Sequence, residues 1–96
     1  MGNPYPNDRQ ATILMILVSG EKYGREINDA FAHETGKPMP LGSLYVTLDR
    51  MEQNGWLKTK QRKSKHPKGG NHRTYFCISG EGQKTLRAYQ MNNDLK

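Results

Sequence analysis

Apolar residues recur at helical spacing in the first third of the chain. Two overlapping sets at i, i+3 and i+4 are formed by Ile13, Leu14, Ile16, Leu17 and Val18. Such a pattern is wide enough for a helix that is buried on more than one side. Asn7 or Asp8 can cap this helix after two prolines, and Ser19-Gly20 can end it, so we predict a helix over residues 8–19.

A second helical pattern follows over residues 22–34 and ends before Gly36. Its apolar positions are spaced i, i+4, i+7 and i+8, and they are Tyr23, Ile27, Ala30 and Phe31. The expected solvent side holds Arg25, Glu26, Asn28 and Asp29. Pro38 and Pro40 exclude a helix through 37–40, because proline lacks an amide donor and restricts the residue before it. This connection therefore sets the angle between two helices.

The clearest helical stripe lies over residues 41–54 and ends at Asn54-Gly55, where a left-handed cap is favourable. The stripe consists of Leu41, Leu44, Tyr45, Leu48 and Met51, and we expect it to pack in the core. The other face carries Ser43, Val46, Thr47, Arg50 and Asn54. These side chains are mostly short and able to form hydrogen bonds, unlike the Glu/Lys pattern of a merely solvated face.

After Trp56-Leu57 the period changes to two. Lys58, Lys60 and Arg62 alternate with Thr59 and Gln61, and Arg73, Tyr75 and Cys77 alternate with Thr74, Phe76 and Ile78. We predict a hairpin of two strands joined by the polar segment 63–72, which is too long for a tight turn. Ser79 can cap a last helix, with Glu81 near its positive end, running to about Asn92.

This order of elements predicts a mainly α fold with a small β-hairpin, the winged helix-turn-helix. Three helices precede a two-stranded wing and a short C-terminal helix. We expect one domain over residues 1–96, with its core in 8–78 and a dimerisation helix in 79–92.

Positive charge is concentrated in the predicted hairpin. The 96 residues include 15 basic and 9 acidic ones, which gives a net charge of +6. No acid occurs between Glu52 and Glu81, and that interval contains Lys58, Lys60, Arg62, Lys63, Lys65, Lys68 and Arg73. A basic segment of this kind is typical of a protein that binds a polyanion.

Other classes of protein fit the sequence poorly. A single cysteine, Cys77, excludes an internal disulfide, and no pair of histidines or cysteines has a metal-ligand spacing. The longest apolar run, Ile13 to Val18, is too short for a membrane span, and the N-terminus lacks a basic export region. No catalytic triad or phosphate-binding loop is present. We therefore expect a cytoplasmic protein that is not an enzyme and needs no cofactor or metal.

In a winged helix, the third helix enters the major groove and the wing contacts phosphates. The candidate DNA-binding residues of the 41–54 helix are Gly42, Ser43, Tyr45, Val46, Thr47 and Arg50. Lys22 and Tyr23 begin the second predicted helix, where backbone amides favour a phosphate. The candidate wing residues are the seven cations of the acid-free interval. Of these, Lys58, Lys60 and Arg62 share one face of a strand.

Three segments together resemble the PadR-like family of transcriptional regulators. They are Tyr23-Gly24-x-x-Ile27; Gly42-Ser43-Leu44-Tyr45-x-x-Leu48-x-Arg50-Met51-Glu52-x-x-Gly55-Trp56-Leu57; and Arg73-x-Tyr75-Phe76-x-Ile78-Ser79-x-x-Gly82. The resemblance covers roughly residues 10–86. It implies a prokaryotic, dimeric regulator of double-stranded DNA, commonly a repressor that releases DNA when a small-molecule effector binds near the dimer interface.

The segment after the wing departs from that family. Relatives generally carry a long helix or a further helical domain there, whereas about 17 residues follow Ser79 in this chain. We expect dimerisation through an exposed apolar stripe shared by the first and last helices, with Leu14, Leu86 and Tyr89 as its residues.

Two alternatives remain open at this stage. A winged helix can bind nucleic acid without sequence preference, or it can act as a protein-interaction module. Arg50 can pair with Asp49, Glu52 or Glu26 instead of DNA, and the basic wing can be a solvated loop. The expectation carried forward is a dimeric repressor on a palindromic operator, located in the prokaryotic cytoplasm.

Overall fold

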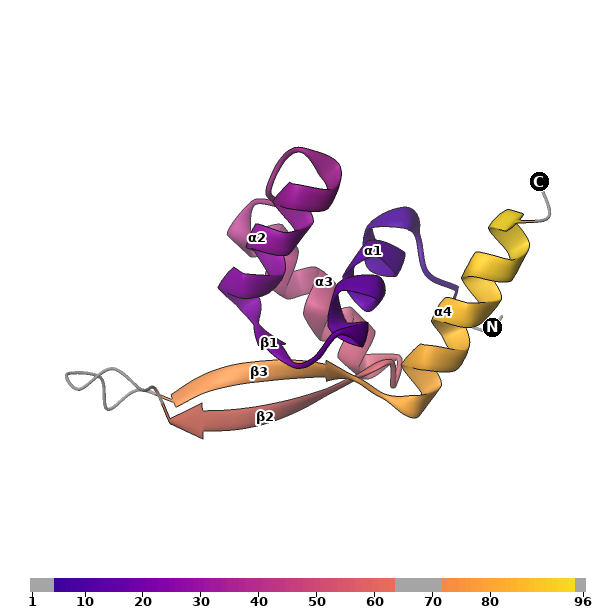
Figure 1. Cartoon of the computed structure of the whole chain (residues 1–96). Helices are drawn as coiled ribbons and strands as arrows, with labels where there is room; N and C mark the ends of the chain where they lie inside the picture. The colour runs from indigo at the N-terminus through magenta and orange to yellow at the C-terminus, as the bar shows by residue number, and fades with distance from the viewer. Residues whose placement is uncertain (1–4, 64–71, 95–96) are drawn as a thin grey trace.

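A computed structural model describes residues 5–63 and 72–94. Its elements are, in order, α1 (Asp8–Val18), β1 (Lys22–Tyr23), α2 (Gly24–Thr35), α3 (Leu41–Gln53), β2 (Leu57–Lys63), β3 (His72–Ile78) and α4 (Gly80–Asp94). Helices α1, α2 and α3 gather on one side of the sheet, and α4 lies at the end opposite to the far end of the β2–β3 hairpin (Figure 1). This architecture confirms the predicted winged helix. The hairpin β2–β3 is called the wing below.

The sheet has one strand more than predicted. Its order is β1–β3–β2, and β1 pairs antiparallel with β3 through Lys22 opposite Phe76 and Tyr23 opposite Tyr75. The prediction that residues 22 and 23 begin a helix was wrong, because α2 starts at Gly24. Two residues are too few to show a period of two, and their strand conformation depends on a partner far along the chain.

The register of the wing separates its side chains into two faces. Lys58, Lys60 and Arg62 lie opposite Cys77, Tyr75 and Arg73, and these six residues form the outer face. Thr59 and Gln61 lie opposite Phe76 and Thr74 on the inner face, which also holds Leu57 and Ile78. Leu57 and Phe76 are buried, so the inner face is the one that packs on the helices.

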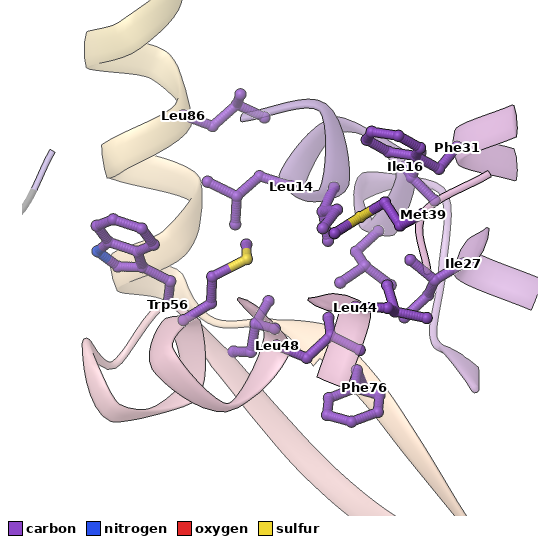
Figure 2. Packing of buried hydrophobic residues seen from close by; sticks show 14 residues of the cluster. Leu14, Ile16, Ile27, Phe31, Met39, Leu44, Leu48, Trp56, Phe76 and Leu86 are labelled. Carbon is purple, nitrogen blue, oxygen red and sulfur yellow. The ribbon is translucent and has the colours of Figure 1, made fainter. Parts of the chain in front are cut away.

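The core joins all four helices to the inner face of the sheet. Figure 2 shows side chains from α1 to α4 converging, and the cluster includes Leu14, Ile27, Leu44, Leu48, Trp56, Phe76 and Leu86. The stripe predicted for the third helix is buried at Leu44, Leu48 and Met51. This packing fixes the position of α3, because three consecutive turns contribute a buried residue.

Asn28 corrects the expected solvent side of α2. It is buried, and its side-chain amide nitrogen donates to the Met39 carbonyl oxygen at 2.9 Å. The Met39 backbone N–H in turn donates to the Asn28 Oδ1 at 2.8 Å. Both backbone groups of Met39 are thereby satisfied inside the protein. Asn28 thus holds the connection that orients α3 relative to α2.

Ser79 ties the end of α3 to the start of α4. Its hydroxyl donates to the Gly55 carbonyl oxygen at 2.5 Å and accepts from the Gly82 backbone N–H at 2.9 Å, which confirms the predicted helix cap. Gly82 lies directly against the backbone of Trp56, and a Cβ at this position would overlap the Trp56 carbonyl oxygen. Close approach of α4 to the end of α3 therefore requires a residue without a side chain.

Candidate nucleic-acid interface

The outward side of α3 presents small and polar side chains. Gly42, Ser43, Val46 and Arg50 are exposed, and Thr47 is half-buried. Arg50 makes no ion pair with any residue of the described ranges, so the pairings considered from sequence do not hold its guanidinium. This side of α3, with these five residues, is called the reading face below. It can approach a groove closely because Gly42 and Ser43, its members in the first turn, have little or no side chain.

Tyr45 does not belong to the core, contrary to the prediction. Its exposed fraction is 50%, and its hydroxyl end lies against the backbone of Gly24 at the start of α2. A Cβ at Gly24 would overlap the Tyr45 hydroxyl oxygen, so glycine at this position lets the ring lie across the helix start. This contact explains why α2 begins with a glycine.

A cationic hollow adjoins the reading face. It has a volume of about 390 Å³, and it is lined by Tyr23, Gly24, Arg25, Tyr45, Arg73 and Thr74. The guanidinium carbon of Arg73 lies 4.4 Å from the ring centroid of Tyr23, which itself packs edge-on against Tyr75 with the centroids 5.5 Å apart. The Tyr23 ring thus orients the guanidinium by a cation–π contact.

Chemically, this hollow suits an anion. It combines two guanidinium groups with tyrosine rings and with the first residues of α2, whose amides point outward at a positive helix end. Glu26 accepts a hydrogen bond from the Tyr23 backbone N–H at 3.1 Å and satisfies one of these amides. The prediction named Tyr23 for this role, and it missed Arg25, because the helical pattern assigned Arg25 only to a solvent-facing side.

Lys22 is separated from Tyr23. It lines a different hollow, of about 350 Å³, between α1 and α2, together with residues such as Thr12, Met15 and Glu34. Adjacent residues of a strand point to opposite faces, which accounts for the separation. Lys22 is therefore left out of the candidate interface.

The wing cations do not gather beside the reading face. Lys58, Lys60 and Arg62 lie on the outer face of the sheet, opposite to the face covered by α3. Lys63 ends β2, and Lys65 and Lys68 lie outside the described residues. Arg73 is the one cation of the predicted wing set that the described structure places in the hollow next to α3.

The space between α3 and the inner face of the wing is acidic. A hollow of about 380 Å³ there is lined by Tyr45, Asp49, Glu52, Thr59, Thr74 and Phe76. The Thr59 hydroxyl donates to the Glu52 carboxylate at 3.2 Å, and the Gln53 side chain donates to Asp49 at 2.9 Å. Both carboxylates repel a phosphate, so this hollow separates the two regions in which a polyanion could be held.

Glu21 changes the expected charge of the wing. The wing sequence contains no acid, yet the Glu21 carboxylate ion-pairs with the Arg62 guanidinium and lies 4.0 Å from the Lys60 amine. The hydrogen bond from Arg62 lowers the pKa of Glu21, and the charges of Arg62 and Lys60 lower it further, whereas partial desolvation opposes them. The same hydrogen bond raises the pKa of Arg62. Sequence gave no signal for this pair, because 41 positions separate its members.

The predicted dimerisation stripe is not exposed. Leu14 and Leu86 are buried in the core of the protomer, with exposed fractions of 0% and 5%. Tyr89 is half-buried, hydrogen-bonded to Asp8, and its ring centroid lies 5.9 Å from that of Tyr5. The apolar residues that α1 and α4 do expose next to this side are Val18 and Met91. The prediction failed because α4 packs on α1 of its own chain, and this packing buries the apolar residues of the stripe.

Within residues 5–63 and 72–94, no helix is long and apolar enough to span a membrane. Likewise, no group of three or more histidine, cysteine or acidic side chains in the described part of the chain is arranged to hold a metal ion.

Comparisons with known proteins agree with this architecture. The sequence model of the transcriptional regulator PadR-like family matches residues 13–88. A transcriptional regulator from Clostridium thermocellum is similar in structure, with a TM-score of 0.77 and 27% identity over 91% of this chain and 81% of that one.

Two other solved structures share the fold. A PadR family transcription regulator from Clostridium difficile has a TM-score of 0.76 and 24% identity, covering 90% of this chain and 86% of its own. A PadR-like transcriptional regulator from Bacillus cereus has a TM-score of 0.77 and 23% identity, covering 90% and 81%. Among curated proteins, none matches the chain.

Proposed function

The chain belongs to the PadR-like family of transcriptional regulators, and from that membership we propose that its reading face recognises a specific double-stranded operator. Members of the family are DNA-binding regulators rather than enzymes, so the part left to assign is how this chain reads DNA. The observation that carries the proposal is that the cationic hollow is lined from α3 by Tyr45, the residue next to Val46 of the reading face. One duplex can therefore meet groove-reading and phosphate-holding groups together.

The reading face has the chemistry of direct readout. Hydroxyls such as those of Ser43 and Thr47 can donate to or accept from base edges, and a methyl-bearing side chain such as Val46 can contact the methyl group of thymine. Arg50 carries the planar guanidinium that suits the two acceptors of guanine. Because α3 is held by three buried residues, these groups are presented on a rigid element.

In the cationic hollow, Arg25 and Arg73 neutralise phosphates that flank the groove. A contact of this kind fixes the register of the protein on the duplex and carries no sequence information. The three outer-face cations of β2 are not assigned to this duplex, because none of them lines the hollow. Arg73 shares their face, but its guanidinium lies over the Tyr23 ring at the β1 edge of the sheet, where it lines the hollow. Of the wing set expected from the sequence, the proposal thus retains Arg73, whereas Lys65 and Lys68 lie outside the described residues.

We further propose that the protein acts as a symmetric dimer and represses transcription from a palindromic operator in the cytoplasm. Two copies of α3 would then enter half-sites about one helical turn apart. Val18 on α1 and Met91 on α4 are 59% and 60% exposed, and they offer apolar surface to a second copy. Light scattering at tens of micromolar is expected to give the dimer mass for the wild type and the monomer mass for a V18D M91D variant. A monomeric wild type would contradict the dimer.

The specificity proposal is tested by replacing Ser43 and Thr47 together with alanine. We expect discrimination between operator and scrambled duplex to fall by about 1–3 kcal/mol, since base-edge hydrogen bonds are lost while phosphate contacts remain. The measurement is anisotropy of a labelled duplex from upstream of the protein's own gene, against a scrambled duplex, at low and physiological salt. The matched control is Thr12→Ala with Ser19→Ala, which removes the same groups from α1 and from its C-cap.

Different outcomes separate the alternatives. If the S43A T47A substitutions lower the affinity for both duplexes equally, binding is independent of sequence, and the reading face does not contact base edges. If the wild type binds neither duplex at low salt, the protein-interaction module becomes the better account of the fold.

A further inference from the structure

Glu21 crosses the outer face of the sheet to reach the wing. It precedes β1 directly, whereas Arg62 belongs to β2, and β3 runs between these two strands. The Arg62 Nη2 donates to the Glu21 Oε1 at 3.0 Å, and the Arg62 Nε contacts the other carboxylate oxygen. Because both oxygens are engaged, the pair is bidentate and has a defined orientation.

The middle strand of the sheet, β3, also contributes to this contact through Tyr75. The guanidinium carbon of Arg62 lies 5.8 Å from the ring centroid of Tyr75 on β3, and Tyr75 lies opposite Lys60, whose amine approaches the same carboxylate. Side chains from before β1, from β3 and from β2 are thus joined across the whole width of the sheet. The Glu21 carboxylate is the group that links the helical body to β2 on this face.

The contact lies where the wing has little other support. β1 pairs with Tyr75 and Phe76, so among the described residues β3 has no strand partner on that side from Thr74 to His72. An isolated two-stranded hairpin is only marginally stable. Arg62 lies opposite Arg73, two pairs beyond the end of β1, and is therefore placed to hold the unsupported part of the wing.

We propose that Glu21 is a positioning residue for DNA binding, which braces the wing from its outer face and keeps Arg73 beside Tyr45. The inference rests on the proposed function, because it concerns the approach of a duplex to the reading face and the cationic hollow. Without the brace, the wing must be ordered when DNA binds, and that ordering weakens binding. Glu21 itself does not line the cationic hollow.

An alternative role for Arg62 predicts the opposite change in DNA affinity when the charge of Glu21 is removed. If Arg62 bound a phosphate directly, Glu21 would compete with DNA, and removing its charge would tighten binding and steepen the salt dependence. The bracing role instead predicts weaker binding with an unchanged salt slope, because the number of neutralised phosphates stays the same.

The experiment compares E21Q, the charge-swapped E21R R62E variant and the control E34Q, using anisotropy of the operator and scrambled duplexes from 50 to 200 mM salt. Glu34 lines the hollow between α1 and α2 and makes no ion pair within the described residues, so E34Q changes the net charge equally. We expect E21Q to bind both duplexes about threefold to fivefold more weakly than E34Q, as an exposed pair of this geometry allows. The swapped variant should return to within about twofold of the wild type, since it restores the pair.

Amide hydrogen exchange of the free protein gives a second measurement that needs no DNA. The amides of Arg73 and Tyr75, which lie opposite Arg62 and Lys60 in the hydrogen-bonded pairs of the wing, are expected to exchange several-fold faster in E21Q and at the wild-type rate in the swapped variant. Binding by E21Q equal to or tighter than E34Q overturns the brace while leaving the proposed function in place, as does a swapped variant that stays as weak as E21Q. Unchanged exchange overturns it as well. A wild type that binds no duplex overturns the proposed function and the brace together.

Discussion

An R25A R73A variant is expected to bind every duplex on the order of 50-fold more weakly than the wild type near 0.1 M salt. Each phosphate that is no longer neutralised removes about 0.9 from the slope of log affinity against log salt. Two lost contacts therefore lower the steepness of that slope by about 2. The ratio of operator to scrambled binding should stay nearly constant, because phosphate contacts are shared by all sequences.

The control for this variant is K58A K84A, which also removes two positive charges. Lys58 lies on the outer face of the wing and Lys84 is exposed on α4, so neither belongs to the hollow. We expect its affinity to fall only a few-fold and its salt slope to stay close to that of the wild type. Equal losses in the two variants would show that net charge alone governs binding and that the cationic hollow has no special role. Thermal unfolding followed by circular dichroism confirms that both variants are folded.

Replacement of Gly82 by alanine is expected to destabilise the fold by about 3 kcal/mol. The new methyl group would overlap the Trp56 carbonyl oxygen and would also crowd the Ile78 side chain, 2.9 Å from the Cβ position. A backbone atom cannot rotate away as a side chain can, so α4 must shift as a whole. In a domain of this size the expected fall in Tm is roughly 15 °C.

Gly80→Ala is the matched control for Gly82→Ala. A Cβ at Gly80 meets nothing within 4 Å, and this residue belongs to the same first turn of α4. Alanine there is expected to leave the free energy of unfolding unchanged or slightly higher, because the unfolded chain loses conformational freedom. If both variants unfold at the same temperature, the close contact between α4 and Trp56 does not limit stability.

The helices were predictable because each one shows its period within a single segment. Leu44, Leu48 and Met51 repeat over three turns, and the structure buries all of them. The capping of α1 by Asn7 and of α4 by Ser79 was likewise readable, since a cap depends on residues three positions apart.

The features that escaped prediction depend on partners far away in the sequence. β1 exists because β3 supplies its hydrogen bonds, and Asn28 is buried because Met39 satisfies its amide. Tyr45 leaves the core because Gly24 offers it a surface. In each case the local sequence pattern identified the type of side chain but gave no information about the distant residue that determines where it lies.

The candidate site shows the same division. The reading face followed from the helical period of α3, and the structure leaves Ser43, Val46 and Arg50 exposed as expected. The positive charge of the wing was predictable from the sequence, but the face of the sheet on which it lies was not. Lys58, Lys60 and Arg62 lie on the outer face because the alternate residues of β2 pack on the helices. The absence of acidic residues from the wing sequence does not exclude an ion pair with an acidic residue of another segment, such as Glu21.

The hydrogen bonds of Ser79 fix the direction of α4 relative to α3. One hydroxyl joins the carbonyl of Gly55, just after α3, to the first turn of α4. The direction in which α4 leaves the domain is therefore set by α3, the helix proposed to enter the groove. In a symmetric dimer built on α4, the Ser79 hydroxyl oxygen would fix the angle between α4, which sets the spacing of the two subunits, and α3. Any tilt of α4 would then appear as a change in the number of base pairs between half-sites.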